Sequence, residues 1–126
     1  MPYLPHAVMA SVRDLAGRVV AVRLRDLGVD SYPRYQLLLD VELTQHPSRA
    51  VVRGVKFYAP LTITLPGGNQ KSTPRGKYDD LIEDILVRLT PAQRSLAKVE
   101  EYLNNQLKNT PVMLQTIGGV WTISQI

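Results

Sequence analysis

Alternating apolar and polar residues predict three consecutive antiparallel β-strands in residues 18–65. The clearest run places an apolar side chain at every second position of residues 35–43: Tyr35, Leu37, Leu39, Val41 and Leu43. Successive side chains of a strand point to opposite faces, so this period of two indicates a strand with one buried face. Similar alternation predicts a strand from residue 18 to the turn at Gly28, and a third strand over residues 51–65.

The third predicted strand is unusually long, and two of its residues favour a distortion. Gly54 adds backbone freedom, and Pro60 cannot donate a hydrogen bond to a neighbouring strand. We therefore expect a bend, a bulge or a sheet edge at Pro60. Residues 1–17, with Pro2 and Pro5, are interpreted as an N-terminal arm that includes one helical turn before Gly17.

The second half of the chain changes to a helical period. After a Gly- and Pro-rich basic loop over residues 66–77, apolar residues recur every three or four positions in residues 78–109. Thr90 followed by Pro91 resembles a helix N-cap, so this insertion is predicted to hold two helices. Residues 111–126 form two β-rich runs around Gly118-Gly119, which predicts a C-terminal hairpin.

The order of these elements resembles that of the OB-fold, a five-stranded, partly open Greek-key barrel. The resemblance covers residues 18–126 of one domain and implies a mainly β fold, β-β-β-α-α-β-β. It also implies binding of oligonucleotides or oligosaccharides on the second and third strands. The helical insertion is longer than one short helix, and no residue motif supports the resemblance. An α+β sandwich and an SH3-like barrel are the alternatives.

Composition excludes several kinds of site. The chain has no cysteine, and its two histidines, His6 and His46, lie forty residues apart. Disulfides, thiolate zinc sites and cysteine nucleophiles are thereby excluded, and a histidine-based catalytic site is not expected. We predict no cofactor, no metal and no enzymatic activity. No apolar run approaches the roughly 20 residues of a membrane span, so we expect a cytoplasmic protein without membrane association.

Two short motifs invite a chemical interpretation that the residues do not support. The loop before Lys71 lacks the glycine that a phosphate-binding P-loop requires, because Gln70 occupies that position. The acidic residues from Asp79 to Asp84 could bind a divalent cation. Carboxylates in a first helical turn also complement the helix dipole, and we favour this second interpretation.

Positive charge is concentrated in the first part of the chain. Residues 1–77 hold eleven Lys/Arg and five Asp/Glu, a net charge of +6, whereas residues 78–126 hold four and six, a net charge of −2. This asymmetry favours a polyanionic partner, although a solvated basic surface would produce the same pattern. The candidate nucleic-acid-binding residues are the cations of the strands and basic loop with two tyrosines: Arg23, Arg25, Tyr32, Arg34, Arg53, Lys56, Tyr58, Lys71, Arg75 and Lys77.

These features favour a non-enzymatic, single-stranded DNA- or RNA-binding protein of the OB type. Proteins of this kind combine a cationic groove with aromatic side chains on which bases stack. Replication, recombination, or a phage or mobile-element context would suit such a protein. The alternative is a protein–protein interaction or assembly module that forms homo-oligomers through strand edges, particularly those of residues 51–65 and 120–126.

Overall fold

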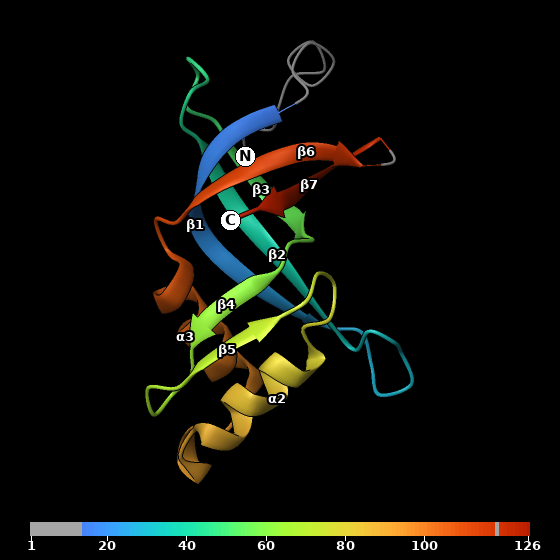
Figure 1. Cartoon of the computed structure of the whole chain (residues 1–126), viewed down its shortest axis with the longest axis vertical. Coiled ribbons are helices and arrows are strands. Elements are labelled where there is room, and N and C mark those ends of the chain that lie inside the picture. Colours follow the sequence, from blue (N-terminus) through green and yellow to red (C-terminus); the bar gives the residue numbers. More distant parts are fainter. Residues whose placement is uncertain (1–13, 118) are drawn as a thin grey trace.

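Five strands close into a barrel in the order β1-β2-β3-β7-β6 (Figure 1). The computed structural model describes residues 14–117 and 119–126. The barrel strands are β1 (Asp14–Asp26), β2 (Tyr35–Leu43), β3 (Val51–Phe57), β6 (Pro111–Ile117) and β7 (Val120–Gln125). Antiparallel pairs make up the barrel except where β3 meets β7 in parallel, with Lys56 opposite Thr122. This order and closure confirm the mainly β, OB-like barrel with a helical insertion.

The predicted strand over residues 51–65 is two strands in different sheets, so the expectation of one continuous strand was wrong. β3 ends at Phe57, and β4 (Leu61–Thr64) pairs with β5 (Gln70–Thr73) in a separate two-stranded sheet. The break surrounds Pro60, which has no N–H to donate. The segment predicted as a basic loop over residues 66–77 therefore contains a strand, β5.

The N-terminal boundary also differs from the expectation. β1 begins at Asp14, and its first residues pair with β6, from Asp14 opposite Gln115 to Arg18 opposite Pro111. The expected helical turn before Gly17 is therefore wrong for residues 14–17, because these residues pair with β6 as part of a strand. The rest of the expected arm, residues 1–13, lies outside the described residues.

Bulges in β1 and β3 change which side chains face the core. The register with β2 shifts between Val19 and Ala21, so both Val19 and Val22 are buried while Val20 is 38% exposed. A second shift lies between Leu39 and Val41, opposite Gly54 of β3. Gly54 has φ +66°, a backbone conformation that glycine adopts without steric cost. A simple alternation cannot locate such extra residues, because each bulge reverses the phase.

Two helices, α2 (Asp79–Arg88) and α3 (Leu96–Leu107), follow β5. The expected start of the second helix at Thr90 was wrong: Pro91 begins a 3-10 turn, η1 (Pro91–Gln93). α3 starts five residues later at Ser95, whose hydroxyl accepts a hydrogen bond from the Lys98 N–H at 3.2 Å. Among the described residues, no helix is long and apolar enough to cross a bilayer.

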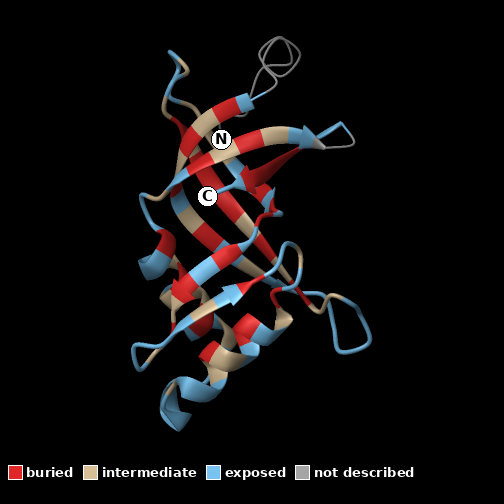
Figure 2. Cartoon of the chain, viewed as in Figure 1, coloured by how far each residue is buried: buried red, intermediate tan, exposed pale blue. Residues whose placement is uncertain are grey.

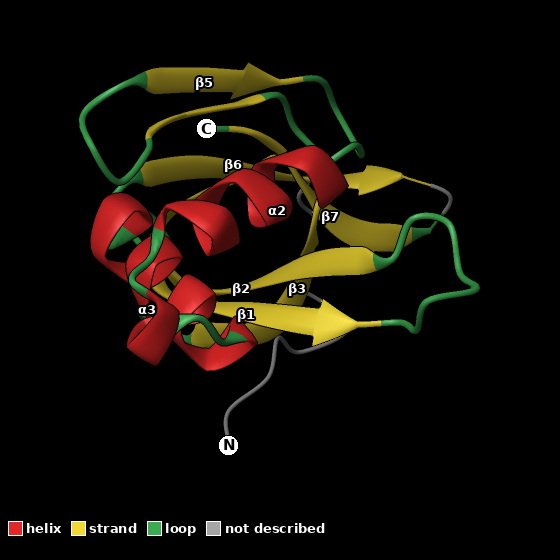
Figure 3. Ribbon diagram, turned by 90° about the horizontal axis from the view of Figure 1, so that it is seen from below, coloured by secondary structure: helices red, strands yellow, loops and turns green. Residues whose placement is uncertain are grey.

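The helices cover the lower end of the barrel and share its hydrophobic core (Figures 2 and 3). Leu81 and Ile85 of α2 and Leu103 of α3 are fully buried in one cluster with Phe57 of β3. The apolar stripes predicted for residues 78–109 therefore face inward. The helices and the barrel strands share one continuous hydrophobic core.

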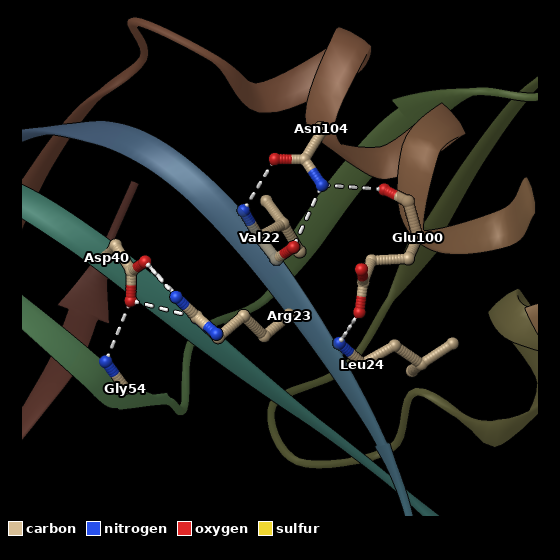
Figure 4. A network of polar contacts seen from close by, with 7 residues as sticks. All are labelled: Val22, Arg23, Leu24, Asp40, Gly54, Glu100 and Asn104. Atoms are coloured by element: carbon tan, nitrogen blue, oxygen red, sulfur yellow. Dashed lines mark hydrogen bonds and ion pairs between the residues drawn. The ribbon is translucent and has the colours of Figure 1, made fainter. Parts of the chain in front are cut away.

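Polar side chains of α3 also complete the backbone hydrogen bonding of β1 (Figure 4). Asn104 accepts from the Val22 N–H at 2.7 Å and donates to the Val22 carbonyl at 2.8 Å. Glu100 accepts from the Leu24 N–H at 2.8 Å. Because β6 pairs with β1 only as far as Arg18, α3 supplies hydrogen-bond partners where that strand has ended.

Of the strands proposed for self-association, β3 and β7 have both neighbours inside the barrel. β3 lies between β2 and β7, and β7 lies between β3 and β6. Among the described strands, β4 and β5 form a two-stranded sheet, so each keeps one edge that pairs with no other strand. Homo-oligomerisation through strand edges remains a prediction, and the outer edges of the β4–β5 sheet are available to it.

Candidate nucleic-acid interface

Two cations from distant segments meet at the ring of Tyr58. The Lys56 Nζ lies 5.6 Å from the ring centroid, and the Arg75 Cζ lies 5.7 Å from it. Both distances are in the range of cation–π interaction. Lys56 belongs to β3, whereas Arg75 lies in the connection between β5 and α2. We call Lys56, Tyr58 and Arg75 the Tyr58 cluster.

Hydrogen bonds hold the backbone at Tyr58 and at the residue that follows it. The Tyr58 N–H donates to the Ile123 carbonyl of β7 at 2.9 Å. One hydroxyl holds both backbone groups of the next residue, Ala59: the Tyr78 Oη accepts from the Ala59 N–H at 3.1 Å and donates to the Ala59 carbonyl at 2.6 Å. Burial raises the pKa of the Tyr78 phenol, which keeps this donor protonated at neutral pH.

Gly76 packs directly against the Tyr58 ring. A Cβ atom built on Gly76 would lie 2.9 Å from the Tyr58 Cε1, closer than side-chain carbons approach one another. Gly76 also has φ +76°, a conformation that is unfavourable for other residues. A substitution would therefore strain the backbone in addition to clashing with the Tyr58 ring. The glycine therefore lets the loop approach the ring closely and bring Arg75 to it.

Tyr58 borders a pocket of about 230 Å³ at the end of the barrel. Its wall is largely apolar and aromatic and includes Leu27, Pro33, Tyr35, Phe57, Tyr58 and Tyr78. A second hollow of about 390 Å³, lined by Lys56, Tyr58, Val120 and Thr122, also borders Tyr58. The ring thus stands between two concave surfaces, one toward the β1–β2 loop and one toward β7.

The β1–β2 loop (residues 27–34) is anchored at its base and exposed at its tip. Arg34 pairs with Asp26 at 3.3 Å, and its Cζ lies 4.9 Å from the Tyr35 ring centroid. Hydrogen bonding between Arg34 and Asp26 raises the pKa of Arg34 and lowers that of Asp26. The Asp79 carboxylate of α2 accepts from the N–H groups of Arg34 and Tyr35 at 3.0 and 2.9 Å. Tyr32, beside the pocket residue Pro33, is 84% exposed.

Strand register places several predicted residues on the same outer face of the barrel. Arg23 lies opposite Leu38, Leu38 opposite Lys56, and Lys56 opposite Thr122. Arg25 lies opposite Gln36, which lines the 230 Å³ pocket. Arg23 and Arg25 of β1 and Lys56 of the Tyr58 cluster therefore lie on one outer face formed by β1, β2 and β3.

Three of the predicted cations are engaged in ion pairs. Arg23 pairs with Asp40 at 2.9 Å, Arg34 pairs with Asp26, and Lys71 pairs with Asp84 of α2. Within residues 14–117 and 119–126, no ion pair involves the other five: Arg25, Arg53, Lys56, Arg75 and Lys77. Lys71 is thus directed to α2, whereas Arg75 of the same predicted loop reaches Tyr58.

The acidic residues of α2 serve the fold. Asp79 accepts backbone hydrogen bonds from the start of β2, and Asp84 pairs with Lys71. No group of three or more potential metal ligands occurs among the described residues. Asp79 and Asp84 therefore contact other segments of the chain, and the interpretation that the carboxylates complement the helix dipole stays a prediction.

Sequence reasoning missed the residues that shape the pocket. Leu27, Pro33, Gln36 and Gly76 come from three segments that the fold brings together. The positive φ of Gly76 and its contact with Tyr58 depend on the loop conformation, for which no short motif exists. The Arg-Gly pair inside a basic loop was the one local signal available.

Comparisons with protein-family models, with curated proteins and with solved structures find no match to this chain. The OB-like assignment therefore rests on strand order and barrel closure. Any statement about function rests on the geometry of the candidate site.

Proposed function

We propose that this protein binds single-stranded nucleic acid on the outer face of β2 and β3, without catalysing a reaction. The observation that carries the proposal is the Tyr58 cluster, in which a partly exposed aromatic ring meets two cations beside two concave surfaces. Single-strand binding combines base stacking on aromatic rings with cationic contacts to phosphates. The cluster offers both within one site.

Position within the barrel also supports this proposal. Proteins with the OB-fold commonly bind oligonucleotides through strands 2 and 3 and the loop between strands 1 and 2. In this chain, Lys56 lies on β3, Tyr58 directly follows it, and the β1–β2 loop borders the same pocket. A cytoplasmic location, expected from the sequence, is part of the proposal, as is a setting in replication, recombination or a mobile element.

Fluorescence anisotropy with labelled oligothymidine and oligouridine tests the proposal. We expect micromolar or tighter binding at low salt, and Tyr58→Ala should weaken it about tenfold because one stacked base is worth roughly 1–3 kcal/mol. The double variant Lys56→Ala/Arg75→Ala should weaken binding further, through lost phosphate contacts.

A charge-matched double variant provides the control. Arg94 and Lys108 are exposed just before and just after α3, lie outside both hollows that border Tyr58, and are in no ion pair within the described residues. Arg94→Ala/Lys108→Ala should bind as the unmodified protein does. The proposal fails if micromolar protein binds neither oligomer at low salt, or if the two double variants lose affinity equally.

A further inference from the structure

We infer that the 230 Å³ pocket beside Tyr58 accepts a single nucleobase from the bound strand. The inference rests on the proposed function and deepens it, because it makes binding depend on a base as well as on phosphates. It assigns the pocket a ligand class, a planar aromatic ring system. It also assigns the β1–β2 loop a role as one wall of the site.

The size of the pocket suits one ring system. Sites for drug-sized ligands occupy roughly 300–1,000 Å³, and the pocket of about 230 Å³ lies just below that range. A base attached to a chain can enter while its sugar and phosphate remain outside. A complete nucleotide cofactor would need more space.

The walls of the pocket match the faces of a base. Tyr35, Tyr58 and Tyr78 contribute aromatic side chains, and Leu27 and Pro33 contribute apolar ones. Enzymes that extrude a base from a duplex hold it in a similar way, by stacking between aromatic and apolar side chains. Tyr35 and Tyr78 are each 3% exposed, so these walls are fixed by the core.

Polar groups in the pocket wall can form hydrogen bonds with the edge of a base. Gln36 carries an amide that both donates and accepts hydrogen bonds. Within the described residues, neither the Gln36 amide nor the Tyr35 hydroxyl makes a side-chain hydrogen bond, and neither is a fully buried polar atom, so both groups remain accessible from the pocket. A ligand that brings its own donors and acceptors would satisfy them.

Charge around the opening fits a base that arrives on a polyanion. Lys56 lines the pocket, and Arg75 and Lys77 flank Gly76 at its rim. None of these three cations is ion-paired within the described part of the chain. The phosphates on either side of an inserted base would therefore lie near cations that are not ion-paired. An uncharged aromatic ligand would make no use of these cations, so their position favours a base that is part of a nucleic-acid strand.

Filling the pocket from its rim separates base binding from phosphate binding. Leu27 is 40% exposed, so Leu27→Trp can place a larger ring over the pocket without entering the core. Anisotropy is measured with oligothymidine and with an oligomer of the same length built from abasic tetrahydrofuran units. Leu27→Trp should weaken oligothymidine binding about tenfold, the scale of one lost stack, and leave binding of the abasic oligomer unchanged.

Two further variants make the experiment decisive. Gln36→Trp approaches the same pocket from β2 and should reproduce the effect if Leu27→Trp alters folding. Val87→Trp, at a 58% exposed position of α2 outside the pocket, should change neither affinity. Thermal unfolding of each variant checks that it is folded.

Each outcome separates this inference from the proposed function. Equal binding of oligothymidine by the unmodified protein and by both pocket variants overturns the base pocket and leaves nucleic-acid binding intact. Equal loss of affinity for both oligomers also overturns it, because the tryptophan then acts on phosphate contacts. If the unmodified protein binds neither oligomer, the proposed function fails, and the base pocket fails with it.

Discussion

The Asp40 carboxylate accepts a 2.9 Å hydrogen bond from the N–H of Gly54, at the residue where β3 bulges. Asp40 also accepts hydrogen bonds from the Arg23 guanidinium of β1 (Figure 4). The bulge of β1 at Val20 lies beside it in the register of the sheet. One side chain of the central strand thus connects the two distorted strands on either side.

Asp40→Ala should destabilise the fold by about 2 kcal/mol. Asp40 is 5% exposed, and the substitution removes the charged acceptor of the Gly54 N–H; a hydrogen bond to a charged group contributes roughly 1.5–3 kcal/mol. Asp40→Asn keeps an oxygen acceptor and should lose less. Urea denaturation monitored by circular dichroism measures both differences.

Arg23→Ala distinguishes the bulge from the ion pair. The Arg23 side chain is 52% exposed, and exposed ion pairs contribute little to stability. We therefore expect a much smaller loss for Arg23→Ala than for Asp40→Ala. If both variants lose the same free energy of unfolding, the Arg23–Asp40 ion pair accounts for the stabilisation. The hydrogen bond from the Gly54 N–H to Asp40 would then contribute nothing measurable.

Asn104→Ala should destabilise the protein and expose the amide of Val22 to exchange. The side chain satisfies both backbone groups of Val22, so its removal leaves two polar groups of β1 without partners, at a cost of about 2 kcal/mol. Hydrogen exchange of the Val22 amide and urea denaturation test this. The neighbouring Asn105 is exposed, and Asn105→Ala should leave both measurements unchanged.

A barrel strand could be predicted from sequence where one of its faces is buried along its whole length, because apolar residues then alternate with polar ones. β2 keeps its alternation from Tyr35 to Leu43 because its inward residues meet the core throughout. The pattern misled over residues 51–65, because Ala59, Leu61 and Ile63 continue to be buried after the chain has left β3 for another sheet. Burial alone does not reveal which sheet a strand joins.

The candidate site was predictable in composition and only partly in position. Lys56 and Tyr58 share one short segment, so their proximity follows from sequence. Arg75 joins them because the backbone at Gly76 approaches the ring, whereas Lys71 is drawn to Asp84 on α2. Tertiary packing decides which cation of a loop forms an ion pair with a carboxylate. No local sequence pattern indicates that choice.

Acid should weaken the anchoring of the β1–β2 loop through Asp26. Hydrogen bonding to Arg34 lowers the pKa of Asp26 below its ordinary value of 3.8, so the folded state favours the carboxylate. The resulting stabilisation is complete above that ordinary value and is lost as the pH falls through the lowered pKa. The difference in melting temperature between the unmodified protein and Asp26→Asn should be constant from neutral pH to about pH 5 and shrink below about pH 4.

A matched variant checks that this acid effect belongs to Asp26. Asp30 lies at the exposed part of the same loop, and no ion pair involves it within the described residues. Asp30→Asn should leave the acid dependence of the melting temperature unaltered. If Asp26→Asn shows the full acid dependence of the unmodified protein, the Asp26–Arg34 contact does not control it.

The salt dependence of binding should distinguish the cations that contact phosphates. Each phosphate contact to a single strand contributes a slope of about −0.7 to the logarithm of affinity against the logarithm of salt concentration. Arg75→Ala and Lys56→Ala should therefore each make the slope less steep by about 0.7, because both cations lie at Tyr58. Lys71→Ala should leave it unchanged, since Asp84 already neutralises that charge. If the slope changes with Lys71→Ala and not with Arg75→Ala, the phosphates contact β5, and the placement of the interface at the Tyr58 cluster is wrong.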